Sequence, residues 1–589
     1  MDTIIGIDLG TTNSGVCVIR DGKPVMLPDE DGQTILPSFV GFDNQGQLLV
    51  GQSARNQAIL APERTVRSIK RRMGEDTKVS MGDDTFTPQE ISAMILRTLK
   101  DRATRVLGEE VGKAVITVPA FFNEMQREAT RQAGELAGLE VVRIINEPTA
   151  AALVYQPDTD CGERLLVYDL GGGTFDVSIV QIEGGVVEVL SSHGDTRLGG
   201  DDFDELLLKH VCDQFQETHG LDLRQLPAAR SRLLQAVEEA KKVLSFEPCA
   251  SVNEEFIAEK DGGALHLTCE ILRQDYEAMI EPLLKKTIKC VDDALEDAKL
   301  HAKDIDKIVL VGGSSRTPLV HHLLEEQLRQ TPHQEVDPDL CVAMGAAVQG
   351  GLIAGLDVGS VLVDITPHTL GIQCRSLLHG LPSVFCFAPI IGRNTPLPAT
   401  RSEMFSTCVD GQKVAEINVF QGENDDVRRN QPVGDFLLEG LDESAEAGNE
   451  ILVRFELNLD GILIVTAVER ISGLERQLTI DNAISQFRQS GQEDAQAKLD
   501  GIFGPERQPS PARETDLDEV PAEVKQAVKE AIHLITKAHQ VLPEADPEDV
   551  AELEALIEQM EDSITRRALE KIRETRAKLE DIVFYLQDA

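Results

Sequence analysis

The stretch Tyr168-Asp-Leu-Gly-Gly-Gly-Thr-Phe-Asp176 is the most informative part of this chain, because a near-copy stands at Ile7-Asp-Leu-Gly-Thr-Thr-Asn13. Each copy runs from an apolar strand through an aspartate into a turn of glycine and threonine. Backbone N–H groups in such turns point at anionic oxygens with no Cβ in the way. Either copy alone also fits an ordinary β-turn. Together they predict two related lobes that close on one polyphosphate.

The two aspartates of these turns are Asp8 and Asp169. Neither binds phosphate directly, because like charges repel. Both are suited to hold Mg²⁺ through water, since that ion keeps much of its hydration shell. The chain has no Walker A loop, and no Gly-x-Gly-x-x-Gly follows the first strand. The paired turns are therefore the predicted nucleotide site.

Composition excludes several classes of partner. The 589 residues include 57 basic and 101 acidic side chains, a net charge of −44, which argues against nucleic acid and anionic membranes as partners. A strand is expected directly at residues 3–7, with no basic leader, and no apolar run is long enough to span a membrane. The ten cysteines form no Cys-x-x-Cys pair, so a reducing cytoplasm is expected rather than a disulfide scaffold or zinc ribbon.

Residues 1–355 alternate strand and helix patterns, which predicts α/β layering. The clearest strands are 114–118 and 307–311, and the clearest helices are 123–138 and 317–330. Residues 165–168 and 176–182 are expected to form a hairpin around the second glycine turn.

Four further segments follow the α/β part. Residues 356–366 are short and apolar, and we interpret them as an interdomain linker that docks in one state, the alternative being a last strand of the first domain. Residues 367–483 show alternating patterns and hairpin signals at 460–461 and 472–473, which predict an antiparallel β-domain. Residues 484–516 are expected to be a flexible linker with at most one marginal helix. Residues 517–589 regain helical spacing and predict two antiparallel helices, a lid-like segment.

The motifs resemble those of the 70-kilodalton heat shock protein (Hsp70) chaperone family, bacterial type, within the actin-like ATPase superfamily. The resemblance covers about residues 1–483. The chain end, Tyr585-Leu-Gln-Asp-Ala589, lacks the tail of eukaryotic cytosolic members, which favours a bacterial source. The matching stretches are Gly6 to Ser14, Ile69 to Arg71, Ile116 to Phe122, Asn146 to Ala151, Asp169 to Asp176, Leu198 to Asp204 and Val311 to Arg316.

The resemblance implies a multidomain fold: an actin-like two-lobed ATPase domain, an antiparallel β-sandwich that binds peptide, and an α-helical C-terminal segment. It implies ATP or ADP with Mg²⁺ as cofactors. Asp8 and Asp169 would place the hydrated ion, Lys70 would lie beside the terminal phosphate, and Glu147 and Thr174 would share in catalysis. The residues implied to contact the nucleotide are Gly10, Thr11, Thr12, Asn13, Gly171, Gly172, Gly173, Gly199, Gly200, Glu238, Lys241, Ser245, Gly312, Gly313, Ser314, Arg316 and Asp337.

Two further sets of residues are implied by the same resemblance. Coupling between the domains would run through Pro119, Arg127, Leu362, Val363 and Asp364. The peptide pocket would be lined by Ile372, Phe405, Ala415 and Ile417, although each also suits an ordinary sandwich core.

Three departures from the family bear on these roles. Ala415 replaces the usual valine of the peptide pocket, and the segment 375–392 is longer and more apolar than its counterpart. Both put the peptide preference in doubt. The stretch between Lys70 and Pro119 is short for the family, so contacts with an exchange factor would differ. The helical end matches least well and predicts a reduced lid with fast peptide exchange.

The implied function is an ATP-dependent chaperone that binds extended hydrophobic segments of unfolded polypeptides, with a J-domain cochaperone and a nucleotide exchange factor as partners. Two alternatives stay open. One is a scaffold dedicated to one client, such as iron–sulfur cluster assembly. The other is a small-molecule kinase of the same superfamily, which would lack the linker and the β-domain.

Overall fold

The computed structural model describes residues 3–155, 162–260, 262–332, 337–356, 358, 361–378, 380–459, 461–480 and 489–503, and beyond them only Leu556, Lys571, Thr575, Arg576, Lys578 and Leu579. The chain divides into two units, Met1–Ile502 and Phe503–Ala589. The first unit is mixed α/β. Among the described helices, none has the length and apolar character needed to cross a membrane.

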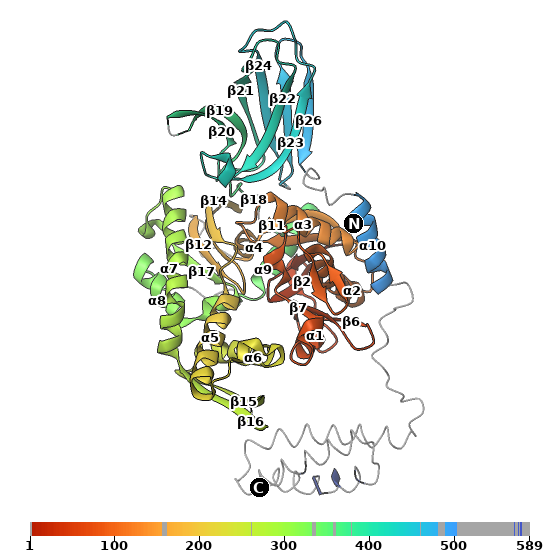
Figure 1. Cartoon of the computed structure of the whole chain (residues 1–589), viewed down its shortest axis with the longest axis vertical. Helices are drawn as coiled ribbons and strands as arrows, with labels where there is room; N and C mark the ends of the chain where they lie inside the picture. The colour runs from red at the N-terminus through yellow and green to blue at the C-terminus, as the bar shows by residue number, and fades with distance from the viewer. Residues whose placement is uncertain are drawn as a thin grey trace. The chain divides into compact units, whose positions relative to one another are not determined.

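Two large sheets of the first unit share one strand pattern (Figure 1). In each, a glycine turn joins an antiparallel hairpin, β1–β2 or β12–β13, and the first hairpin strand has a parallel neighbour, β10 or β17. The repeat in the sequence is therefore a repeat in the structure. The first sheet has the order β11-β10-β1-β2-β3, with β4 on β2: β1 Ile4–Asp8, β2 Asn13–Arg20, β3 Lys23–Met26, β4 Ile35–Pro37, β10 Lys113–Val118 and β11 Glu140–Asn146. The second has the order β17-β12-β13-β14-β18: β12 Glu163–Leu170, β13 Phe175–Glu183, β14 Val186–Asp195, β17 Lys307–Val311 and β18 Val361–Val363.

Two helices, α4 (Glu147–Val154) and α9 (Cys341–Ile353), pack against each other in a core that includes strands of both sheets. At Gly345 a Cβ atom would lie 1.8 Å from the carbonyl oxygen of Ala150, so only glycine permits this approach. The core therefore joins the two sheets through a close helix pair.

The remaining elements of residues 1–355 are helices and small sheets of two or three strands (Figure 1). The helices are α1 Gln52–Gln57, α2 Pro88–Leu107, α3 Glu124–Leu136, α5 Gly200–His219, α6 Pro227–Leu244, α7 Arg273–Asp297 and α8 Pro318–Leu328. The strands are β5 Phe39–Phe42, β6 Leu48–Val50, β7 Thr65–Arg67, β8 Val79–Met81, β9 Asp84–Phe86, β15 Cys249–Lys260 and β16 Gly263–Leu272.

The predicted elements of this part are found within a few residues. The strand expected at 307–311 is β17, and the helix expected at 123–138 is α3. That helix begins where it does because the Asn123 side chain accepts a hydrogen bond from the Gln126 N–H, and the Gln126 side chain accepts one from the Asn123 N–H. This capping box satisfies two donors that the first turn leaves unpaired.

The segment 356–366 contains a strand of the second sheet, which agrees with the alternative interpretation made from the sequence. Its role as an interdomain linker that docks in one state stays a prediction. Val361–Val363 forms β18, which pairs in parallel with β14 through Leu362 opposite Val187 and Val363 opposite Glu188. Leu362 packs against the core that holds α4 and α9. The segment is thus the edge strand of the second sheet and also the connection to the next domain.

Residues 370–480 form two four-stranded antiparallel sheets around one core. Because alternate side chains point to opposite faces of a strand, the buried positions of β22 read Ala415, Ile417 and Val419. A hairpin lies at 472–473 as predicted, whereas Asp460 lies outside the described residues. One sheet has the order β20-β19-β22-β23: β19 Leu370–Leu378, β20 Leu381–Ile391, β22 Val414–Gln421 and β23 Gln431–Glu439. The other has the order β21-β24-β25-β26: β21 Ala399–Ser406, β24 Glu450–Leu457, β25 Leu463–Glu469 and β26 Glu475–Ile480.

The segment 484–516, expected to be a linker with at most one marginal helix, contains helix α10 (Gln489–Phe503). This helix has tertiary contacts: the Lys498 ammonium donates to the Thr85 carbonyl at 2.7 Å and lies 3.6 Å from the Phe86 ring centroid. The two helices predicted in 517–589 lie outside the described residues, apart from the six single positions named above.

Candidate functional site

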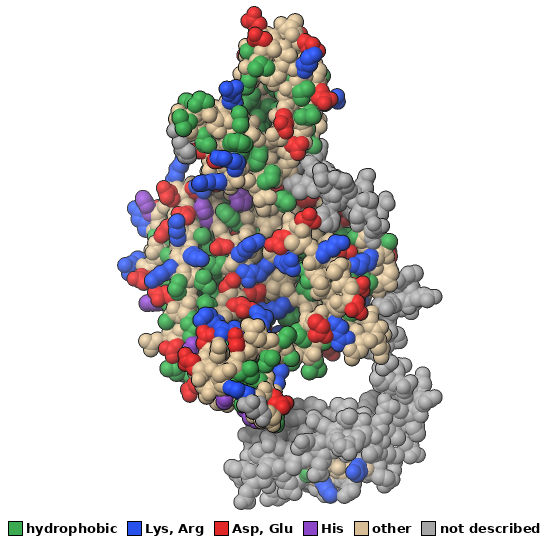
Figure 2. Space-filling model, in the orientation of Figure 1, with side chains coloured by type: hydrophobic (Ala, Val, Ile, Leu, Met, Phe, Trp, Pro, Cys, Tyr) green, Lys and Arg blue, Asp and Glu red, His purple; other side chains and the backbone are tan. Residues whose placement is uncertain are grey.

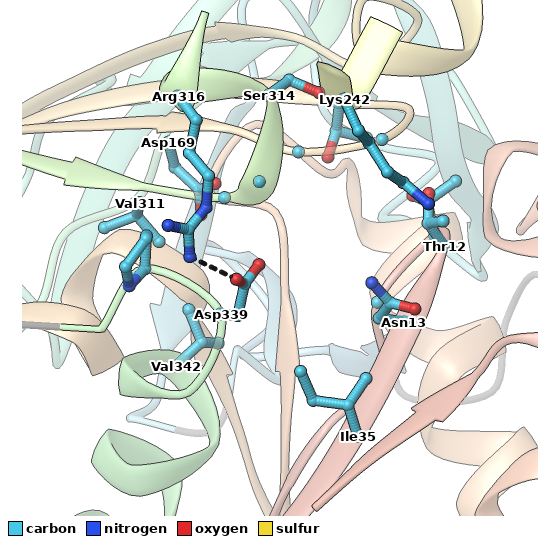
Figure 3. A pocket seen from close by; sticks show the side chains of 18 of the residues that line it. Thr12, Asn13, Ile35, Asp169, Lys242, Val311, Ser314, Arg316, Asp339 and Val342 are labelled. Carbon is cyan, nitrogen blue, oxygen red and sulfur yellow. Dashed lines mark hydrogen bonds and ion pairs between the residues drawn. The ribbon is translucent and has the colours of Figure 1, made fainter. Parts of the chain in front are cut away.

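A cavity of about 490 Å³ opens where the two glycine turns meet (Figure 3). Thr12 and Asn13 come from one side of it, and Asp169 and Arg316 from the other (Figure 3). Most of the predicted nucleotide and catalytic residues line this cavity: Asp8, Gly10, Thr11, Thr12, Asn13, Lys70, Glu147, Asp169, Gly171, Gly172, Thr174, Glu238, Lys241, Ser245, Gly312, Gly313, Ser314 and Arg316.

The two turns are in direct contact. A Cβ atom on Gly172 would lie 1.8 Å from the Thr12 hydroxyl oxygen, so the turns approach this closely only with glycine at that position. Four predicted residues do not line the cavity: Gly173, Gly199, Gly200 and Asp337. Gly200 supports the second turn from behind, because its N–H donates to the Gly171 carbonyl at 3.0 Å.

The inner end of the cavity holds buried charges. The Lys70 ammonium, whose residue is 3% exposed, pairs with the Glu147 carboxylate. Burial, and after it the negative charge of Glu147, raises the pKa of Asp8 to about 7 and the pKa of Asp169 well above its usual range. The same causes raise the pKa of Asp176 to about 7. Several buried carboxyl groups thus surround one lysine, and the inner end favours an added cation.

The side chains at the inner end of the cavity limit which cation would fit there. Among the described residues, no group of three His, Cys, Asp or Glu side chains is arranged to hold a metal ion. Asp8 and Asp169 offer carboxylate oxygens, which suit Mg²⁺ when water and phosphate oxygens complete its shell. The residues present therefore fit a hydrated Mg²⁺ bound together with a polyphosphate.

The outer end of the cavity carries paired side chains. The Arg316 guanidinium donates to the Asp339 carboxylate at 2.6 Å, as Figure 3 shows, while its distance to the predicted Asp337 is 3.8 Å. Across the cavity, Arg55 and Lys242 approach the Glu238 carboxylate at 3.1 and 3.0 Å. These two cations lower the pKa of Glu238 although burial opposes the shift. Glu238 is therefore held ionised against the cavity wall.

Sequence reasoning missed several of these residues. Asp339, rather than Asp337, lines the cavity beside Arg316. Arg55 also lines it but belongs to no motif, and its partner Glu238 is 183 residues away in the chain. Asp176, which lies behind the cavity lining, closes the glycine stretch quoted from the sequence, and its place in that motif was the available signal. The other lining residues not predicted are Ile35, Lys242, Phe246, Val311, Thr317, Pro338 and Val342.

Two of the predicted coupling residues, Arg127 and Asp364, meet around a side chain that was not predicted, Asn146. Arg127 donates to the Asn146 side-chain oxygen at 2.6 Å, and the Asn146 amide donates to both Asp364 carboxylate oxygens at 3.0 and 3.2 Å. Pro119 follows β10, and its carbonyl accepts from the N–H of Phe122 at 3.1 Å. The next residue after Asn146 is Glu147, the partner of Lys70. A short contact path therefore joins the linker to the inner end of the cavity.

The four predicted peptide-pocket residues lie in one core. Ile372, Ala415 and Ile417 are buried, and Phe405 is half-buried against the same cluster. Ile372 stands on β19 opposite Val419 of β22, and Phe405 stands on β21 in the other sheet. The structure brings the four residues together, and their places also agree with the core role that the sequence left open.

Comparison with known proteins agrees with this arrangement. The family model described as "Hsp70 protein" matches residues 4–588. Two proteins named "Chaperone protein DnaK", from Halobacterium salinarum strains R1 and NRC-1, are each 45% identical over 481 residues, which is 82% of this chain and 75% of the relative. By the extent of both matches, this chain belongs to the Hsp70 family.

Proposed function

We propose that this chain is an ATP-dependent molecular chaperone in which the nucleotide bound by residues 1–355 controls the peptide affinity of residues 367–483. Membership of the Hsp70 family makes it a chaperone ATPase and supports binding of unfolded polypeptides. It gives no support to the small-molecule kinase or to the dedicated scaffold. The observation that carries the proposal is the contact of two glycine turns above a buried Lys70–Glu147 pair.

The nucleotide would lie with its phosphates against the two turns and its adenosine toward the outer end of the cavity. Amides of Gly10–Asn13 and Gly171–Thr174 face the phosphates in this proposal, with the threonine hydroxyls as neutral donors. Arg316 would stack on the base, and α6 would present Glu238, Lys241 and Ser245 to the ribose and base. We further propose that residues 1–355 form an actin-like two-lobed ATPase domain, with the nucleotide held between the lobes.

Hydrolysis in this site would be phosphoryl transfer to water, which depends on positioning and electrostatics and needs no covalent nucleophile. Lys70 provides positive charge where the transferring phosphoryl group gains negative charge. Glu147 holds the Lys70 ammonium in place and Thr174 completes the phosphate turn. Asp8 and Asp169 would hold hydrated Mg²⁺, which when bound neutralises phosphate charge. The buried excess of carboxylates supports this role.

The β-domain would bind an extended segment of an unfolded chain. Extended-peptide recognition uses backbone hydrogen bonds for affinity and pockets for alternate side chains for specificity. Ile372, Phe405, Ala415 and Ile417 are the proposed pocket residues. Ala415 leaves more space than a larger aliphatic side chain, so bulky apolar side chains are the expected occupants.

Coupling would depend on the docked linker. When β18 pairs with β14, Asp364 is held by Asn146, and peptide affinity is low; when the linker leaves the sheet, peptide is retained. ATP and peptide must then weaken each other by the same factor, since coupling free energies are reciprocal. Replacing Leu362 and Val363 by aspartate is expected to leave nucleotide affinity intact and to abolish stimulation of hydrolysis by peptide.

A single experiment tests the whole proposal: single-turnover ATP hydrolysis by the full chain, with and without an apolar heptapeptide. Peptide should accelerate hydrolysis in the parent protein and have no effect in the Leu362→Asp, Val363→Asp variant. No nucleotide uptake in calorimetry, or stimulation that persists in the variant, would contradict the proposal. A J-domain cochaperone, a nucleotide exchange factor and a cytoplasmic location remain predictions from the resemblance.

A further inference from the structure

The hairpin of β19 and β20 places two cysteines opposite each other. Cys374 of β19 is paired in register with Cys386 of β20. Both are free thiols; Cys374 is half-buried and Cys386 is buried. Among the strand pairs of the described residues, this is the only position where one cysteine faces another.

The register places the two cysteines at a Cα separation that a disulfide can span. Directly opposite residues of an antiparallel pair have Cα atoms about 4.5 to 5.5 Å apart and side chains on the same face. A disulfide spans Cα atoms about 4.4 to 6.8 Å apart. A second observation supports their proximity: burial raises the pKa of Cys374, and the neighbouring Cys386 thiol raises it further. The strands therefore need little movement for a sulfur–sulfur bond to form.

We propose that Cys374 and Cys386 are a modification site, a dithiol that is reversibly oxidised to an intrachain disulfide by a low-molecular-weight disulfide. One protein thiolate attacks a sulfur of the oxidant and releases one small thiol. The second protein thiolate then attacks the mixed disulfide and releases the other small thiol. One S–S bond forms, one breaks, and the two protons lost by the protein are taken up by the released thiols.

The bond would fix a hairpin next to the proposed peptide pocket. Ile372 precedes Cys374 by two residues, so both side chains lie on one face of β19. At the other end the hairpin exposes Leu377 and Leu381, which are 67% and 71% exposed, and Figure 2 shows hydrophobic side chains gathered there. A cross-link near the base of this apolar projection keeps β19 and β20 together. Its effect on peptide binding rests on the proposed function, whereas formation of the bond does not.

The test uses the full-length protein, oxidised with glutathione disulfide and mapped by mass spectrometry of non-reduced peptides. A mildly alkaline buffer is used, because burial raises the pKa of the Cys374 thiol and the thiolate is the attacking species. The expected product links Cys374 to Cys386 and disappears with dithiothreitol. Hydrogen exchange of the β19–β20 amides should slow by at least about tenfold in the oxidised protein. ATP-triggered release of a labelled apolar heptapeptide should slow by a similar factor.

Three variants separate the possible outcomes. Cys374→Ser and Cys386→Ala should each lose the cross-link and its effects, while Cys408→Ser, at an exposed cysteine of the same domain, should keep both. Stable mixed disulfides without the cross-link, or a cross-link that leaves hairpin exchange unchanged, would overturn the inference. If the reduced protein bound no peptide, the proposed function would fail. The mapped bond and the hydrogen-exchange rates of the hairpin would still test whether the disulfide forms.

Discussion

Replacing Asn146 by alanine tests the contact path between linker and nucleotide cavity. Asn146 is 4% exposed, accepts from Arg127 at 2.6 Å and donates to both Asp364 oxygens at 3.0 and 3.2 Å. The alanine variant removes these two donors from the half-buried Asp364 carboxylate, which keeps only the donation from the Ile365 N–H at 2.8 Å. Hydrogen bonds to a charged group contribute about 1.5 to 3 kcal/mol each, and a lost partner costs a similar amount. The docked linker should therefore be destabilised by at least about 1.5 to 3 kcal/mol, a factor of roughly 10 to 150.

Hydrogen exchange measured by mass spectrometry reads this change directly. The reporter is the peptide that contains β18, whose backbone pairs with β14 in the docked state. In the nucleotide state that protects these amides, their exchange should accelerate by the same factor of about 10 to 150 in Asn146→Ala. Asn253→Ala, at an exposed position of the β15–β16 hairpin, serves as the matched control and should leave the linker unchanged.

A double-mutant cycle with Asp364→Ala identifies the contact as the cause. If the Asn146–Asp364 hydrogen bonds carry the effect, the double variant should be no worse than the more damaging single variant. Fully additive effects, or protection of the linker that survives in Asn146→Ala, would refute the reasoning.

Three further predictions concern the cavity. Gly172→Ala should abolish measurable nucleotide binding in calorimetry, since its Cβ would lie 1.8 Å from the Thr12 hydroxyl, whereas Gly112→Ala, with open space around it, should bind normally. Lys70→Ala should lower the single-turnover hydrolysis rate by about 10² to 10³-fold but still bind ATP, because it removes one electrostatic contact to the transition state. The surface variant Arg72→Ala is the control. An equal loss of rate in that control would contradict the catalytic role of Lys70. The folded-state pKa of Asp8 is raised to about 7, so the stability that its protonation provides is lost as pH rises from about 4 to 7. Asp8→Asn should therefore raise the Tm of the nucleotide-free protein above about pH 7 but give no gain near pH 4, and a constant difference across this range would exclude the titration.

Local patterns were sufficient for most elements of the fold. The predicted strand 307–311 and the predicted helix 123–138 are found as β17 and α3. The antiparallel strands of 370–480 follow from alternation of buried and exposed side chains. Such features depend on side-chain periodicity and capping, which act over a few residues. The two glycine turns are equally local, so they were predictable before any tertiary contact was known, whereas their binding of phosphate stays a prediction.

Contacts between distant residues were not predictable in this way. Arg55 reaches Glu238 across 183 residues, and Asn146 links Arg127 to Asp364. Polar pairs of this kind leave no periodic signal, because each member looks like an ordinary surface residue in its own segment. The cysteine pair shows the same limit. The two cysteines stand twelve positions apart in the chain, and only the strand register, which contains a bulge between Cys374 and Ser376, sets them face to face.

The residues alone predict two glycine turns of one kind, a short apolar segment after them, and then a run of antiparallel strands. These features depend on residues that are close together in the sequence, so they do not depend on how the rest of the chain folds. Three other features depend on contacts between distant segments: the turns touch through Gly172 and Thr12, Val361–Val363 completes the second sheet, and Asn146 lies between Asp364 and Arg127. Close packing and buried charge pairing depend on which segments come into contact, and the residue pattern within one segment does not predict its contact partner.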